Sequence, residues 1–196
     1  MTQMLEFSAT VFGLLQGVFV LLNKRSNWLF YVAQMGCLIC FSAKNNLFGD
    51  VINCSIYLVL GIVGYFYWTE GKSEKKITSC NAKEKIFYTA VIFTSTVALH
   101  YCLRDTKDPL PLLDSFTTTS SMVATLYMIA KKIDTWLIWL VNDVVYVVEY
   151  ANLATPAYYL IALNSAWAVM AVCSYFYWLK LKERQKDEKN IFCRKI

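Results

Sequence analysis

Long apolar runs alternate with short polar breaks along the whole 196-residue chain. A helix that crosses a bilayer needs about 20 mostly apolar residues. Seven stretches fit this requirement, at 7–23, 27–43, 48–69, 86–103, 112–130, 135–152 and 156–179. Only short loops and one polar tail remain between and after them. The pattern therefore predicts an all-α polytopic membrane protein with seven transmembrane helices.

The composition agrees with a membrane protein. Apolar residues make up 57% of the chain, and the mean hydropathy is +0.41. Soluble domains rarely spread so little charge over such long apolar runs. The sequence contains no nucleotide-binding loop, metal-ligand cluster or nucleophile with a partner base, so it predicts neither an enzyme nor a bound cofactor. We expect the seven cysteines to be reduced, packed thiols.

Positive charge falls on one side of the predicted topology. The segments 23–26, 70–85 and 131–134 and the tail after Trp178 hold 16 of the 19 Lys and Arg residues. Since positive loops stay in the cytoplasm, this predicts an outside N-terminus and a cytoplasmic C-terminus. The basic residues mark orientation, which leaves no surface for a nucleic-acid partner.

Two halves of the chain resemble each other. GYFYW at 64–68 recurs as SYFYW at 174–178, and NKRSNWLFYVAQ at 23–34 aligns with AKKIDTWLIWLVN at 130–142. Three spans on each side of a single linking span give parallel repeats in a 3+1+3 arrangement, as in transporters with a midplane solute site. The expected parts are a first three-helix repeat at 1–70, a loop with the linking helix at 71–110, a second repeat at 111–179 and a basic tail at 180–196.

Asp143 stands in the apolar stretch WLIWLVNDVVYVVEY at 136–150. It follows Asp134 by nine residues, which places it about 14 Å into the span. A carboxylate at that depth costs about 3 kcal/mol and by default marks a functional site. It shares one helical face with Trp136, Trp139, Tyr146 and Tyr150. A carboxylate among aromatic rings suits a flat cationic solute.

Other spans carry polar residues that we include in the candidate site. Asn53 and Tyr57 share a face of the third span, and Asn164 lies on the seventh. Gln34 occupies the depth in the second span that Asn142 occupies in the sixth. Together with the face around Asp143, these residues form the predicted substrate site.

Structural interpretations stand beside the functional one. The amides also fit interhelical hydrogen bonds, and several tryptophans also fit the aromatic belt of a membrane interface. The run TTTSS at 117–121 can bond carbonyls of its own helix, so it does not indicate a site by itself.

Four elements give the chain a family resemblance. LLDSF at 112–116, WLIWLVNDVVYV at 136–147, NKRSNWLF at 23–30 and the span ending GYFYW resemble the PnuC-type vitamin transporters, best known for nicotinamide riboside. The likeness runs from about residue 5 to residue 180. It implies a full-length counterpart of the SWEET-type fold. It also implies facilitated diffusion of a dephosphorylated vitamin through a bacterial inner membrane, with trapping by a cytoplasmic vitamin kinase. A homo-oligomer stays open.

Carried over to this chain, the resemblance implies that Trp136 and Trp139 are the tryptophans of the family motif. Asp143 falls where the nicotinamide riboside members have asparagine, and Asn142 lies one place earlier. Nicotinamide riboside leads as the predicted substrate. Thiamine is the alternative, because both rings are permanently positive. A proton-coupled or sugar-type transporter of the same architecture and a membrane sensor without transport also stay open.

Overall fold

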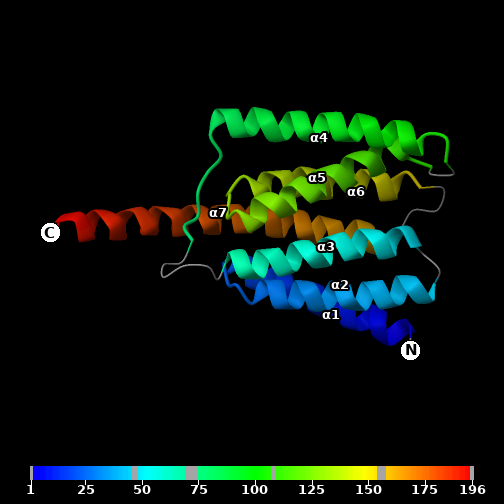
Figure 1. Ribbon diagram of the computed structural model, residues 1–196, viewed down its shortest axis with the longest axis horizontal. Helices are drawn as coiled ribbons and strands as arrows, with labels where there is room; N and C mark the ends of the chain where they lie inside the picture. The colour runs from blue at the N-terminus through cyan, green and yellow to red at the C-terminus, as the bar shows by residue number, and fades with distance from the viewer. Residues whose placement is uncertain (1, 46–47, 69–74, 107–108, 154–157, 195–196) are drawn as a thin grey trace. The chain divides into compact units, whose positions relative to one another are not determined.

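The computed structural model describes residues 2–45, 48–68, 75–106, 109–153 and 158–194. Within these ranges the chain forms seven α-helices (Figure 1): α1 (Thr2–Leu21), α2 (Asn27–Lys44), α3 (Phe48–Tyr67), α4 (Ala82–Leu103), α5 (Pro111–Ile129), α6 (Thr135–Ala151) and α7 (Tyr158–Arg194). Each helix overlaps one predicted span, and α7 continues 15 residues past the predicted end at residue 179. The all-helical prediction is confirmed.

Several of the helices suit a membrane by length and composition alone. The described residues include three helices long and apolar enough to cross one, at Gln3–Leu21, Ala82–Leu103 and Leu160–Asp187. A shorter apolar helix covers Val51–Tyr67. The remaining helices, α2, α5 and α6, carry buried polar side chains, and two of them form the candidate site.

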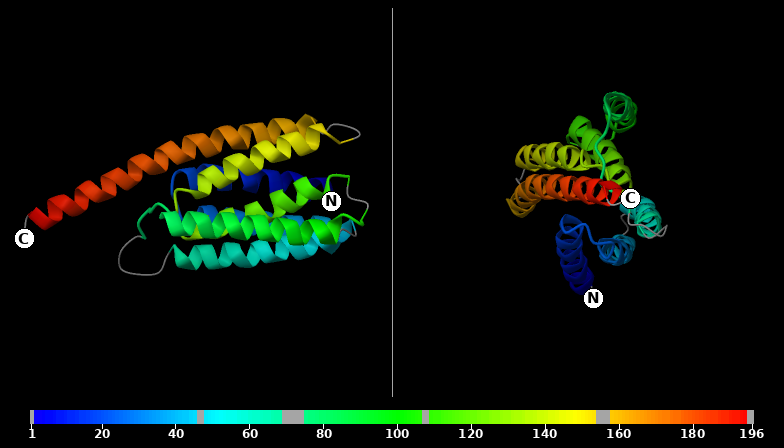
Figure 2. Two further views of the ribbon diagram at one scale, coloured as in Figure 1. Left: turned by 90° about the horizontal axis from the view of Figure 1, so that it is seen from above. Right: turned by 90° about the vertical axis from the view of Figure 1, so that its left-hand side faces the viewer.

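The chain divides into two compact units, Met1–Lys75 and Lys76–Ile196, and each is described by itself. In the first unit, α2 packs against both α1 and α3. In the second unit, α4 packs on α5, α5 on α6 and α6 on α7. The helix α7 is the longest, and it continues as one helix past the ends of α5 and α6 (Figure 2).

The same turn conformation ends the first helix in α1–α3 and in α5–α7. Asn23, two residues after α1, has φ 54°, and Lys131, two residues after α5, has φ 52°. Backbones with positive φ stop a helix by turning the chain out of the right-handed form, and they favour Asn over Lys. The two residues are 108 positions apart in the sequence.

Tryptophan pairs also recur in the two units. Trp28 of α2 meets Trp68 edge to face, with ring centroids 5.6 Å apart and planes at 88°. Trp136 of α6 meets Trp178 of α7 in the same way, at 5.3 Å and 87°. In the first unit, Gly64 makes room for the pair, since an added Cβ would lie 2.6 Å from the ring of Trp28. Both aromatic segments of the predicted internal repeat therefore pack alike.

Candidate substrate site

Hydroxyl side chains line the buried side of α5. The Ser120 hydroxyl lies 2.7 Å from the Phe116 carbonyl, and the Thr125 hydroxyl donates to the Ser121 carbonyl at 2.8 Å. Such bonds within one turn satisfy hydroxyls in an apolar helix. Thr135 at the start of α6 instead donates to the Ala124 carbonyl at 2.7 Å, which joins α6 to α5. The buried hydroxyl residues of α5 are Ser115, Thr117, Ser120, Ser121 and Thr125.

Asn142 is fully buried in the middle of α6. Its Oδ1 accepts a hydrogen bond from the Ser120 hydroxyl at 2.6 Å. Its Nδ2 is also buried and has no hydrogen-bond partner among the described residues. Leaving a buried donor unsatisfied costs about 1–3 kcal/mol. Asn142 therefore offers a donor that a bound molecule can satisfy.

Asp143 is the next residue and is only 6% exposed. No residue in the described part of the chain forms an ion pair or hydrogen bond with its carboxylate. Buried charges are normally paired, because an isolated charge is poorly solvated in an apolar interior. The structure thus leaves Asp143 available to a cationic or hydrogen-bond-donating ligand.

The two motif tryptophans of α6 have different neighbours. Trp136 is 3% exposed and packs against Trp178 of α7. Trp139 is half-buried and packs against a hydrophobic cluster built from Val123, Ala124 and Ile138. Trp136 therefore couples α6 to α7, whereas Trp139 couples it to α5.

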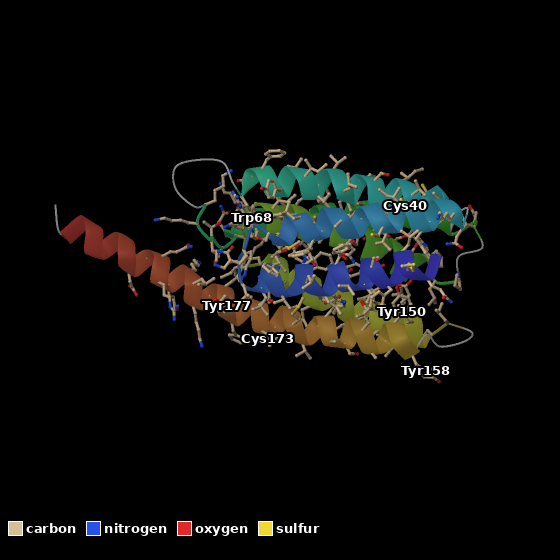
Figure 3. The ribbon with its side chains drawn as sticks, turned by 90° about the horizontal axis from the view of Figure 1, so that it is seen from below. Cys40, Trp68, Tyr150, Tyr158, Cys173 and Tyr177 are labelled. Carbon is tan, nitrogen blue, oxygen red and sulfur yellow. The ribbon has the colours of Figure 1, made fainter. Side chains whose placement is uncertain are left out.

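The aromatic face of α6 continues toward its C-terminal end. The rings of Tyr146 and Tyr150 stack, with centroids 5.6 Å apart and planes at 8°. Tyr150 lies near the same end of the second unit as Tyr158 at the start of α7 (Figure 3). Asn164, a little further along α7, donates its side-chain N–H to the Leu160 carbonyl at 2.8 Å. That bond lies within the helix, so the present contacts of Asn164 are local.

The remaining predicted site residues belong to the first unit. Gln34 is half-buried on α2, and its amide lies against Gly13 of α1, where an added Cβ would be 2.6 Å from Nε2. On α3, Asn53 is exposed and Tyr57 is half-buried. These three predicted site residues thus lie in the first unit, whereas the predicted site residues of α6 and α7 lie in the second.

Two members of the candidate site were not predicted as such. Ser120 belongs to the TTTSS run, whose self-bonding hydroxyls alone indicate no site. Trp178 fitted the membrane-interface belt. The sequence feature that could have indicated Ser120 is the amide of Asn142, because a buried amide needs a hydrogen-bond partner on a neighbouring span. The sequence feature that could have indicated Trp178 is the tryptophan that ends both GYFYW at 64–68 and SYFYW at 174–178.

A second polar cluster lies at the basic end of the second unit, which we define as residues 76–85, 131–134 and the first part of the α7 extension. The α7 extension is the part of α7 after Trp178, residues 179–194. Asp134 is 2% exposed, and its Oδ2 accepts the Cys80 backbone N–H at 2.6 Å. Its Oδ1 pairs with the Lys85 ammonium at 3.1 Å. Burial alone would raise the pKa of Asp134, but these two donors hold it below its usual value. Burial first, and then the Asp134 carboxylate, raise the pKa of the Cys80 thiol from 9.0 to about 12.

In the second unit, the apolar helix α6 carries a buried amide donor at Asn142 and a buried carboxylate at Asp143, both without partners among the described residues. A polar pair inside an apolar helix of a polytopic protein is typical of a membrane transporter's solute pathway. A family model described as nicotinamide mononucleotide transporter matches residues 3–180. The chain belongs to this family, and the expected resemblance to PnuC-type transporters is confirmed.

Individual relatives agree with the family. The chain is 24% identical over 193 residues to the nicotinamide riboside transporter PnuC of Neisseria mucosa, covering 92% of this chain and 73% of the relative. It is 25% identical over 179 residues to the protein of the same name from Haemophilus influenzae, covering 88% and 77%. The crystal structure of the vitamin B3 transporter PnuC has a similar fold, with a TM-score of 0.73 and 24% identity over 92% of this chain and 82% of that one.

Proposed function

We propose that this protein carries an unphosphorylated vitamin with a positively charged aromatic ring, and that nicotinamide riboside is its first substrate. The buried, unpartnered carboxylate of Asp143 beside the unsatisfied amide donor of Asn142 is the observation that supports this most directly. A cationic ring supplies the missing counter-charge. A carboxamide oxygen supplies an acceptor for the Asn142 N–H.

Thiamine is the second candidate, because it satisfies the same carboxylate. Its thiazolium ring is permanently positive, so Asp143 stabilises it as it would a nicotinamide ring. Thiamine lacks a carboxamide, so it makes less use of Asn142. Phosphorylated forms of either vitamin bring negative charge toward Asp143, and we expect them to bind more weakly.

The transport step that we propose is facilitated diffusion through two parallel three-helix repeats. Matching turns at Asn23 and Lys131 and the two tryptophan pairs support the repeat. In transporters of this type the halves rock to open a midplane site to each side in turn. With the basic end in the cytoplasm of an inner membrane, a vitamin kinase there makes net uptake one-way by removing the unphosphorylated form.

Binding by calorimetry on detergent-purified protein tests the proposal. Nicotinamide riboside, thiamine, riboflavin and thymidine are titrated, each with its phosphorylated form as the control. Tight binding of one cationic, unphosphorylated vitamin is the expected result. Tight binding of only neutral compounds contradicts the counter-charge role of Asp143, and binding of none favours a sugar-type transporter or a sensor.

Uptake into proteoliposomes distinguishes facilitated diffusion from proton coupling. Facilitated uptake follows the vitamin gradient and continues when a protonophore abolishes the pH gradient. Proton coupling requires Asp143 to gain and lose a proton in the cycle, so uptake against a gradient then stops. A sensor shows no uptake under either condition.

A further inference from the structure

A short parallel bridge fastens the chain before α4 to the turn between α5 and α6. The Thr78 N–H donates to the Lys131 carbonyl at 3.1 Å, and the Ile133 N–H donates to the Thr78 carbonyl at 2.8 Å. These are backbone bonds, so they do not depend on a flexible side chain. They fix residues 77–81, which we call the strap, against the 131–134 turn.

The Asp134 side chain also binds the strap. Its buried carboxylate accepts the Cys80 N–H through one oxygen and the Lys85 ammonium through the other. Charge-assisted bonds of this kind are about twice as strong as neutral ones. One side chain therefore joins three segments, because Asp134 directly precedes α6, Cys80 lies in the strap and Lys85 lies in the first turn of α4.

Further contacts surround the strap on two sides. Lys132 pairs with Glu84 at 2.7 Å, and Glu84 also forms a capping box with Asn81 that begins α4. From the α7 extension, Gln185 accepts the Ile77 N–H at 3.0 Å through its side-chain oxygen. Lys182 contacts the Ser79 hydroxyl. Every helix of the second unit thus reaches the strap or its turn.

The corresponding turn in the first unit is built differently. Ser26 stands 108 positions before Asp134 and directly precedes α2, but a serine hydroxyl lacks the charge with which Asp134 holds the Cys80 N–H and the Lys85 ammonium. Within the described residues, the bridge between Thr78 and Lys132 is the only one. The strap is therefore a feature of the second unit that the internal repeat does not supply.

We propose that Asp134 is a positioning residue that fastens α4 to α5–α7, so that these four helices move as one body during transport. The inference rests on the rocking mechanism of the proposed function, but not on which vitamin is carried. It makes α4 a fixed part of the second half and not a free linker. It also holds the cytoplasmic end of α6, two residues before Trp136.

A disulfide between the strap and the 131–134 turn tests whether these two segments move relative to each other during transport. Neighbouring strands lie about 4.8 Å apart, so the paired residues of this parallel bridge fall within the Cα separation that a disulfide accepts. The variant is Thr78→Cys/Lys132→Cys in a Cys80→Ser background, which keeps the Cys80 backbone N–H. Uptake of nicotinamide riboside and thiamine is measured before and after oxidation. We expect oxidised and reduced forms to agree within about two-fold, because no relative movement is blocked.

A loss of about ten-fold on oxidation that a reductant reverses would overturn the proposal. Asp134→Asn in the same background provides the complementary test. We expect its uptake to fall several-fold in the reduced form and to recover when the disulfide replaces the lost fastening. Loss that oxidation does not restore would show that Asp134 acts in another way. Glu183→Gln, an exposed carboxylate on the α7 extension, is the matched control and leaves uptake unchanged.

Amide hydrogen exchange separates this inference from the choice of substrate. It is measured without any vitamin, on wild type, Asp134→Asn and Glu183→Gln. We expect exchange at residues 77–85 to accelerate about ten-fold or more only in Asp134→Asn. Equal exchange in all three proteins would overturn the fastening role even if uptake is normal. Faster exchange together with no uptake of any vitamin would instead contradict the proposed function alone.

Discussion

Trp136 and Trp178 meet edge to face, with their ring centroids 5.3 Å apart and their planes at 87°. Trp28 and Trp68 reproduce this geometry in the first unit. The likeness extends to a defect, since the indole N–H groups of both Trp28 and Trp136 are buried without partners among the described residues. Shared packing that includes the same unsatisfied donor favours a common origin for the two triplets over coincidence.

Gly64→Ala should destabilise the protein by about 1–3 kcal/mol, the usual range for overpacking. The new Cβ would lie 2.6 Å from the Trp28 ring, which already packs against Trp68. Gly36→Ala is the matched control, because nothing lies within 4 Å of a Cβ there. Alanine in that helix should stabilise by about 0.5–1 kcal/mol. Thermal unfolding in detergent compares the two, and equal melting temperatures would contradict the packing argument.

Ser174 is the residue of the second aromatic segment that corresponds to Gly64. Its hydroxyl is buried and has no partner among the described residues. Ser174→Ala removes a buried polar group that has no hydrogen-bond partner among the described residues. We therefore expect the free energy of unfolding to stay nearly the same or to rise by about 1 kcal/mol. A loss of stability comparable to that of Gly64→Ala would show that the hydroxyl has a partner in the membrane.

The sequence predicted the elements well and their polar contacts less well. Apolar runs mark helices reliably, because a transmembrane span must satisfy its backbone N–H and C=O groups by hydrogen bonds within the helix. Asp143 was predictable for a related reason, since a carboxylate near the middle of an apolar span by default marks a functional site. The bond from Ser120 to Asn142 was not, because it depends on the rotation of two helices about their axes. Asp134 was equally hidden, since its partners Cys80 and Lys85 precede it by 54 and 49 residues.

Ser120→Ala should weaken both the fold and ligand binding. The Asn142 Oδ1 loses its donor, which costs about 1–3 kcal/mol for a buried acceptor. The amide is then free to turn, so its N–H no longer has a fixed direction toward a ligand. Ser115→Ala is the control, since among the described residues that buried hydroxyl bonds only the carbonyl of Pro111 in its own helix. Calorimetry and thermal unfolding compare the variants, and equal binding by both would exclude an orienting role for Ser120.

Asp143→Asn should keep the fold and change which ligands bind. The amide retains the shape of the side chain but removes the counter-charge. We expect affinity for nicotinamide riboside or thiamine to fall about ten-fold or more, which is 1.4 kcal/mol. Affinity for neutral riboflavin or thymidine should fall less. Asp105→Asn, at an exposed carboxylate, is the control. An equal change in affinity for charged and neutral ligands would contradict the counter-charge role of Asp143.

Cys80 should resist alkylation until the strap is disturbed. With its pKa raised to about 12, only about one thiol in 10⁴ is a thiolate at pH 8. A raised pKa means that reactivity grows about ten-fold for each pH unit up to that value. Asp134→Asn removes a neighbouring negative charge while burial remains, so the pKa falls part of the way and alkylation at pH 8 accelerates. Iodoacetamide labelling, followed at the Cys80 peptide by mass spectrometry from pH 7 to pH 9, measures this. A Cys80 that reacts at the same rate in Asp134→Asn and wild type would show that the carboxylate does not control the thiol.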